Sequence, residues 1–328
     1  MREVLPTLRQ WHDDGRRFAL ATVVRTHGSA PREVGSTMGV RDDATVCGSV
    51  SGGCLDSAVV DACLTAIKTG EAKRLSFPQE GDDVTAVKLM CGGESDVWIV
   101  PRVDAQAWDG LNDRLEQDAG CVLATRLEPF AQAVRGTDES AHCSPLDAAA
   151  ADAYRSRSSA LVEVAGEEWF MQVLAPRPRL VIVGAVHISR ALVAFARQLG
   201  FQTVVIDPRT VFAQFEIQPD SLIHDWPQDA FESMPLDQDT YAVALTHDPK
   251  IDDVAIEALL KSDVAYVGAL GSRTTQNKRK VALREKGLTE EQLAKIHGPV
   301  GLDIGADNPE EIALSVMAEI VKVRRAGG

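Results

Sequence analysis

Hydrophobic residues in the second half of the chain gather in short, β-branched runs that alternate with helical patterns. The four runs are Leu180–Val183, Thr203–Asp207, Tyr241–Leu245 and Val264–Leu270. Between the first two runs, apolar residues over His187–Leu199 recur with the period of a helix. Strands that alternate with helices predict a parallel sheet with helices on both faces. We therefore expect an α/β domain in this half.

The last part of the chain carries a helix-start signal. Asn308 can cap a helix, Pro309 suits its first position, and Glu311 can bond back to the cap. Apolar residues then recur on one face from Ile312 to Val323. This combination predicts a C-terminal helix that begins at Pro309.

The first half has a less regular mixture of helical and strand patterns. In order, the predicted elements are a helix ending near Asp13, a strand over Ala19–Val24, a hairpin around Arg41–Asp43, a helix over Cys54–Lys68, a strand over Val97–Val100, a helix over Trp108–Gln117 and a β-rich stretch up to Val173. This mixture predicts an α+β fold. A Pro-rich segment, Ala175–Pro178, then suits a domain boundary, so two domains are expected, at residues 1–175 and 178–328.

Composition supports two globular domains and limits which classes of partner are expected. The 328 residues are 45% hydrophobic, enough for two cores, and the formal net charge is -14. That charge argues against nucleic acid as a partner, because binding a phosphate backbone needs a basic surface. The sequence shows no signal-peptide pattern and no run of about 18 apolar residues, so no membrane partner is expected. Six cysteines without a C-x-x-C pair or zinc spacing are typical of a reducing compartment, and we expect the cytoplasm.

A glycine-punctuated loop follows the first predicted strand, over residues 27–38. Gly28, Ser29 and Pro31 shape this loop, and Arg32 supplies a guanidinium that can meet an anion. An ordinary hairpin connection with a surface arginine explains the same residues. The residues alone leave both interpretations open.

A second glycine-rich turn, Ser51-Gly52-Gly53-Cys54, opens into a predicted helix. Free backbone N–H groups and the positive end of the helix dipole meet at such turns, and together they hold a phosphate. The alternative is a tight strand-to-helix turn with Cys54 as a small core residue. Neither interpretation is preferred from the sequence.

A lone cysteine begins the segment Cys91-Gly92-Gly93, which leads into the strand that contains Val97. A thiolate is a soft metal ligand, and two following glycines let a bulky ligand approach the backbone. Cysteine is also among the most buried residue types, and a lone cysteine beside apolar neighbours is commonly inert. Taken by itself, the segment favours the inert interpretation.

The loop after Leu180–Val183 occupies the place of a dinucleotide-binding G-x-G-x-x-G fingerprint. It keeps Gly184 and leads into His187, and Asp207 stands where a ribose-binding carboxylate is expected. Val186 and Ser189, however, replace two of the three glycines. A Rossmann-like fold is therefore predicted for this domain, whereas the signal for NAD(P) binding is weakened.

Seven segments, in this order, resemble the xanthine dehydrogenase accessory (XdhC/CoxI) family over most of the chain. They are GSAPREVGSTM, GSVSGGCLD, CGGESDVWIVP, LVIVGAVHIS, THD, VGALGSR and GPVGLDIGADNPEEIALSVMAEI. The resemblance implies a homodimeric accessory protein that binds molybdenum cofactor (molybdopterin). It also implies sulfuration of that cofactor by a cysteine desulfurase and delivery to an apo molybdenum hydroxylase such as xanthine dehydrogenase. Such a protein is a carrier rather than a turnover enzyme.

The family's motifs fall on Gly28–Arg32, Ser51–Cys54 and Cys91–Gly93 of this chain. The resulting hypothesis gives Cys91 the role of metal ligand, holding the molybdenum or its labile sulfur. In the same hypothesis Arg32, Gly52 and Gly53 hold the terminal phosphate of the pterin.

One segment departs from the family pattern. Relatives commonly have Gly-Ala-Gly-His where this chain has Val186 before His187, which puts a nucleotide role for Gly184, His187 and Asp207 in doubt. Two competing hypotheses remain. One is an NAD(P)-dependent oxidoreductase that uses the second domain, and the other is a docking chaperone that binds the partner enzyme but no cofactor.

Overall fold

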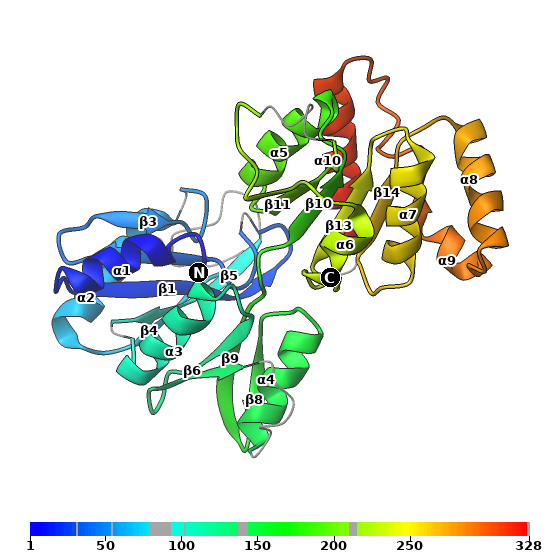
Figure 1. The fold of residues 1–328 in the computed structure, drawn as a ribbon. Coiled ribbons are helices and arrows are strands. Elements are labelled where there is room, and N and C mark those ends of the chain that lie inside the picture. The colour runs from blue at the N-terminus through cyan, green and yellow to red at the C-terminus, as the bar shows by residue number, and fades with distance from the viewer. Residues whose placement is uncertain are drawn as a thin grey trace. The chain divides into compact units, whose positions relative to one another are not determined.

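The chain forms two compact units, Met1–Pro176 and Arg177–Gly328, in a computed structural model (Figure 1). The structure describes residues 1–30, 32–53, 55–78, 93–101, 103–136, 144–209 and 215–326.

The N-terminal unit contains a five-stranded antiparallel sheet in the order β3-β2-β1-β5-β4. Its strands are β1 (Phe18–His27), β2 (Thr37–Arg41), β3 (Val46–Gly48), β4 (Lys73–Phe77) and β5 (Glu94–Val100). Helix α2 (Asp56–Thr69) covers one face, where Val59 and Cys63 pack against Val23, Met38 and Ile99. Alternating apolar residues on the strands supply this core, as expected for a half-buried sheet.

A second antiparallel sheet, in the order β7-β6-β9-β8, completes this unit. Its strands are β6 (Cys121–Arg126), β7 (Ala131–Gly136), β8 (Ala160–Val164) and β9 (Glu167–Leu174), accompanied by the helices α1 (Leu5–Asp13), α3 (Ala105–Glu116) and α4 (Pro145–Arg155). The buried Gln172 links the two sheets, because its amide donates to Gly35 O at 2.7 Å and to Thr37 Oγ1 at 2.9 Å. Trp98 and Phe170 also pack together between the sheets.

The C-terminal unit is built on a six-stranded parallel sheet in the order β12-β11-β10-β13-β14-β15 (Figure 1). The strands are β10 (Arg179–Val183), β11 (Gln202–Ile206), β12 (Ser221–Ile223), β13 (Thr240–Ala244), β14 (Tyr266–Ala269) and β15 (Ile296–His297). Two separate apolar cores, one on each face, show that helices cover both sides of the sheet.

Helices α5 (His187–Gln198) and α10 (Pro309–Ala326) supply one of these cores. The other core contains residues of α6 (Pro227–Glu232), α7 (Pro249–Leu260), α8 (Arg273–Glu285) and α9 (Glu290–Ala294). The predicted fold class, an α+β domain followed by a Rossmann-like parallel sheet domain, is confirmed. Within the described ranges, no helix is both long enough and apolar enough to cross a membrane.

The strand order also locates the ligand-binding edge of such a sheet. Strand β10 lies between β11 and β13, so the chain changes its winding direction at β10. In open parallel sheets, ligands bind outside the carboxyl ends of the strands at this switch point. The loops after β10, β11 and β13 therefore border the ligand-binding edge of this unit.

Candidate functional site

Two of the predicted motifs meet where β1 ends and β5 begins. His27 pairs with Glu94 in the β1–β5 register, which brings Gly93 beside the loop that starts at Gly28. A Cβ atom on Gly93 would lie only 2.4 Å from Ser29 O and 2.8 Å from His27 O. The missing side chain of Gly93 thus allows the two backbone segments to touch.

Arg32 connects the first loop to the second glycine-rich turn. Its Nε donates to the carbonyl of Ser49 at 3.3 Å, and its Nη2 lies 3.6 Å from the carboxylate of Glu3. Gly48, just before this turn, has a φ of 73°, and a Cβ there would lie 2.5 Å from Thr37 O. The two loops therefore lie side by side.

The second turn, however, uses much of its own hydrogen-bonding capacity. The hydroxyl of Ser49 accepts from Gly52 N at 2.8 Å, and that of Ser51 accepts from Leu55 N at 2.8 Å. Both hydroxyls donate to the carboxylate of Asp56 in the first turn of α2. The predicted cluster of unblocked N–H groups is thus not found at Gly52 or Leu55, and an acidic residue stands at this helix start.

A cavity of about 210 Å³ lies next to the first loop, over the ends of β1, β4 and β5. Arg25 and His27 of β1 line it from one side, and Arg74 of β4 lines it from the other. Asp96 lies between them, with its Oδ2 atom 2.8 Å from Arg74 Nη2 and 3.4 Å from Arg25 Nε. Arg25, Arg74 and Asp96 were not predicted from the sequence, because their relationship depends on strand pairing.

The Asp96 carboxylate stays ionised in this setting. Burial would raise its pKa, but the hydrogen bonds from Ser76 and Arg74, with the charges of Arg74 and Arg25, outweigh burial and hold the pKa below its ordinary value. The side chain of Asp96 is only 13% exposed, so it acts as a fixed anchor for the two guanidinium groups. The cavity therefore has a defined arrangement of cations.

Four predicted site residues, Pro31, Cys54, Cys91 and Gly92, lie outside the described residues. The role of Cys91 as a metal ligand accordingly stays a prediction. Among the residues that the structure describes, no group of three His, Cys, Asp or Glu side chains is arranged to hold a metal ion.

Three other cysteines are described, and burial raises the pKa of each thiol. The pKa is about 12 for Cys63 and about 11 for Cys121, and it is also raised for the half-buried Cys47. Thiols with such pKa values carry almost no thiolate at neutral pH, so these three suit packing rather than metal binding or sulfur transfer.

In the C-terminal unit, the loop at the fingerprint position, Gly184–Ser189, is held by hydrogen bonds between its own residues. Gly184 has a φ of 112°, and a Cβ there would lie 2.7 Å from Thr246 Cγ2, so the glycine is needed at this position. The hydroxyl of Ser189, which is fully buried, accepts from Val186 N at 3.2 Å and donates to Gly184 O. Ser189 thereby occupies the N–H group of Val186, a donor that a pyrophosphate could use in a dinucleotide-binding loop.

Asp207 lies at the predicted place after β11, but its carboxylate is already engaged. It has no exposed surface, accepts from Ala185 N at 2.7 Å, and forms an ion pair with Arg209 at 2.9 Å. These contacts hold the loop after β10 in place. A ribose hydroxyl would have to displace them to reach the carboxylate.

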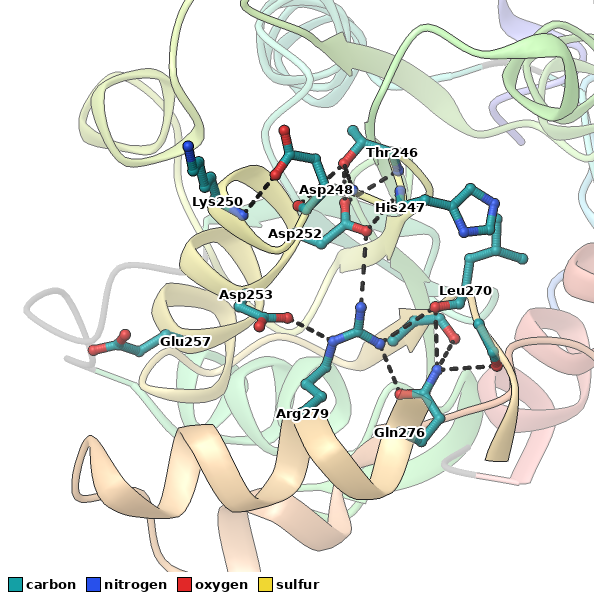
Figure 2. Close-up of polar contacts among 12 residues, drawn as sticks. Thr246, His247, Asp248, Lys250, Asp252, Asp253, Glu257, Leu270, Gln276 and Arg279 are labelled. Atoms are coloured by element: carbon teal, nitrogen blue, oxygen red, sulfur yellow. Dashed lines mark hydrogen bonds and ion pairs between the residues drawn. The ribbon is translucent and has the colours of Figure 1, made fainter. Parts of the chain in front are cut away.

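A buried network after β13 was not predicted (Figure 2). The carboxylate of Asp252 accepts from the backbone N–H groups of Thr246 and His247, both at 3.1 Å, and from the Thr246 hydroxyl at 2.7 Å. Arg279 lies 3.8 Å from this carboxylate and donates to Asp253 at 2.7 Å. Burial raises the pKa of Asp252 in spite of these partners.

The network holds His247 in an unusual backbone conformation. Its φ is 62°, a value uncommon for a residue other than glycine, and such strain persists only where neighbouring contacts fix it. The His247 side chain is exposed at the carboxyl end of β13, and the predicted residue His187 is exposed at the start of α5. The THD segment could have indicated this turn, but the partners Asp252 and Arg279 carry no recognisable motif.

Two family models match this chain. The model described as the XdhC Rossmann domain matches residues 180–320, and the model described as the XdhC and CoxI family matches residues 11–78. The two matches therefore fall in the C-terminal and the N-terminal unit, respectively.

Several known proteins are similar along nearly the whole chain. The uncharacterized protein YqeB of Escherichia coli K12 is 27% identical over 94% of this chain, which spans only 43% of YqeB. The molybdenum cofactor insertion chaperone PaoD of E. coli K12 is 28% identical, over 94% of this chain and 84% of PaoD. A probable xanthine dehydrogenase subunit from Bacillus subtilis 168 is 26% identical, over 95% of each chain.

A solved structure shares the fold. The crystal structure of a xanthine dehydrogenase from Bacillus halodurans matches with a TM-score of 0.74 over 98% of this chain and 96% of that chain, at 24% identity. Matches to both family models, one in each unit, agree with this likeness and with the sequence relatives. The chain belongs to the XdhC and CoxI family.

Proposed function

We propose that this protein binds molybdenum cofactor, supports its sulfuration and delivers it to an apo molybdenum hydroxylase such as xanthine dehydrogenase. The observation that carries the proposal is the meeting of the loops at Gly28, Ser49 and Gly93 beside a cavity that contains Arg25 and Arg74. The similarity to PaoD supports the same role, since PaoD is named as a molybdenum cofactor insertion chaperone.

The described residues fit the phosphate end of such a cofactor. Guanidinium groups bind phosphate with two parallel hydrogen bonds. Arg25 and Arg74 line the cavity, and Arg32 bonds to Ser49 in the second glycine-rich turn. The soft ligand would come from Cys91, which lies outside the described residues. The proposed partners are an apo molybdenum hydroxylase and a cysteine desulfurase, and the proposed assembly is a homodimer. Maturation in the cytoplasm is part of the same proposal.

Anaerobic purification with and without Cys91→Ala tests the cofactor role. Pterin and molybdenum are assayed in both preparations, and we expect both to fall strongly in the variant. Cys47→Ala is the matched control, because Cys47 is a half-buried thiol of the same unit with a raised pKa. Equal cofactor content in wild type and Cys91→Ala would contradict the role of Cys91.

The absence of pterin from the wild type would contradict cofactor binding itself. If that preparation nevertheless activated an apo hydroxylase, the protein would be a docking chaperone that touches no cofactor. Activation is measured by adding purified protein, loaded with cofactor or free of it, to the apo hydroxylase and following its turnover.

A further inference from the structure

We infer that the cavity between β1, β4 and β5 is an anion site for a phosphate monoester, which Arg25 and Arg74 hold from opposite sides. The inference deepens the proposed function and rests on it for the identity of the molecule that carries the phosphate. The chemistry of the cavity itself is independent of that identity.

Strand register builds the site from three neighbouring strands. Arg25 of β1 pairs with Asp96 of β5, which in turn pairs with Ser76 of β4. Side chains directly opposite in a sheet lie on the same face, so these three form one row across the sheet. His27 lies two residues after Arg25 on β1, Arg74 lies two residues before Ser76 on β4, and residues two apart share a face. The guanidinium groups of Arg25 and Arg74, from the non-adjacent strands β1 and β4, thereby line one cavity.

Asp96 pairs with both guanidinium groups through a single oxygen atom. Its Oδ2 lies 2.8 Å from Nη2 of Arg74 and 3.4 Å from Nε of Arg25. Among the described residues, Asp96 is the one carboxylate paired with Arg25, so both Nη groups of Arg25 are available to a ligand. Asp96 is one carboxylate shared by two guanidinium groups, so each keeps N–H donors that a phosphate oxygen can meet.

Two other carboxylates, Glu168 and Glu94, lie near these guanidinium groups and are more exposed than Asp96. Glu168 approaches Arg74 Nη1 at 3.6 Å, but its side chain is 51% exposed, and such exposed pairs contribute little. Glu94 lines the cavity opposite His27 and is also exposed. Water screens both groups more strongly than it screens Asp96.

The volume and the lining of the cavity suit a phosphate group together with part of the group that it esterifies. The cavity has a volume of about 210 Å³. Phe77 and Pro78 give it an apolar wall, which strengthens charge-assisted hydrogen bonds by excluding water. The cavity also reaches Thr26 and His27, next to the loop that begins at Gly28.

Titration with inorganic phosphate, at constant ionic strength set with sodium chloride, tests the site. Binding is followed by ³¹P line broadening for the wild type, Arg25→Gln, Arg74→Gln and Arg155→Gln. The last is the matched control, because Arg155 pairs with Asp152 on α4 and does not line the cavity. Circular dichroism melts establish that every variant is folded.

We expect each cavity variant to weaken phosphate binding by about tenfold or more, as for a lost hydrogen bond between charged groups, and the control to match the wild type. Absence of phosphate binding by the wild type, or equal weakening in all three variants, would overturn the inference. Pterin content of the wild type is measured separately. If the wild type contains pterin but does not bind phosphate, the anion site is refuted and the proposed function is not. If the wild type binds phosphate but contains no pterin, the anion site is supported and the proposed function is refuted.

Discussion

The guanidinium of Arg209 forms two hydrogen bonds with the carboxylate of Asp207, from Nε to Oδ1 and from Nη2 to Oδ2, each 2.9 Å long. The same carboxylate also accepts the backbone N–H of Ala185, in the loop where a dinucleotide would lie. Because a ribose must compete with both partners, we expect no micromolar binding of NAD(H) or NADP(H). Isothermal titration calorimetry checks this, and a micromolar dissociation constant would revive the oxidoreductase hypothesis.

The ion pair between Asp207 and Arg209 also predicts a pH dependence of stability. Burial would raise the pKa of Asp207, but the bonds from Arg209 and Ala185 outweigh burial and hold the folded-state pKa below its ordinary value. A carboxyl group with a lowered folded-state pKa contributes stability above its unfolded pKa and loses it as the pH falls through the folded one. The stability difference between wild type and Asp207→Asn should therefore be largest near neutrality and shrink below about pH 3.8.

Urea unfolding between about pH 7 and about pH 3 measures this difference. Asp303→Asn is the control, because Asp303 is exposed and should show little effect at any pH. A difference between wild type and Asp207→Asn that stays constant over the whole range would show that the pair does not titrate as argued.

The C-terminal fold could be predicted because its signals are local. Each β-branched run forms a strand, and Asn308 caps the last helix by accepting from Glu311 N at 2.8 Å. Alternation of strands and helices then leaves few possible topologies, since crossovers between parallel strands are almost always right-handed.

The N-terminal site depends on pairing between distant residues. Arg25 meets Asp96 only because β1 and β5 are antiparallel neighbours with an irregularity in register between Val23 and Arg25. Hydrophobic periodicity identifies a strand but not its partner. Helix α4 was not predicted either, although Ser144 and Asp147 form a capping box at its start, because the surrounding pattern favours strands.

Asp252→Ala should destabilise the C-terminal unit by about 3 kcal/mol, because the buried Thr246 hydroxyl loses this acceptor, whereas Arg279 keeps its ion pair with Asp253. The N–H groups of Thr246 and His247 lose their acceptor at the same time. Chemical denaturation measures the change in unfolding free energy. Asp225→Ala is the control, since Asp225 is exposed, and equal effects of the two substitutions would refute the importance of the network.

Gly93→Ala should lower the free energy of unfolding more than Gly52→Ala does, for a geometric reason. A Cβ at Gly93 meets the backbone oxygen atoms of Ser29 and His27, which cannot move without separating the two loops. We therefore expect Gly93→Ala to lower the free energy of unfolding by about 3 kcal/mol. Gly52 has a φ of 69° with open space around it, so only backbone strain of about 1–2 kcal/mol is expected. Denaturant midpoints of both variants give the comparison, and a smaller loss for Gly93→Ala would contradict the close packing of the loops.

Thiol reactivity in the folded protein separates packing cysteines from candidates for cofactor chemistry. Burial raises the pKa to about 12 for Cys63 and about 11 for Cys121, so both should resist iodoacetamide at neutral pH and react only after denaturation. Mass spectrometry of peptides after native alkylation checks this. Rapid labelling of Cys63 or Cys121 would mean that the core around it opens readily. If both stay protected, any fast thiol belongs to one of the remaining four cysteines, and loss of that fast labelling in Cys91→Ala would identify Cys91 as the reactive one.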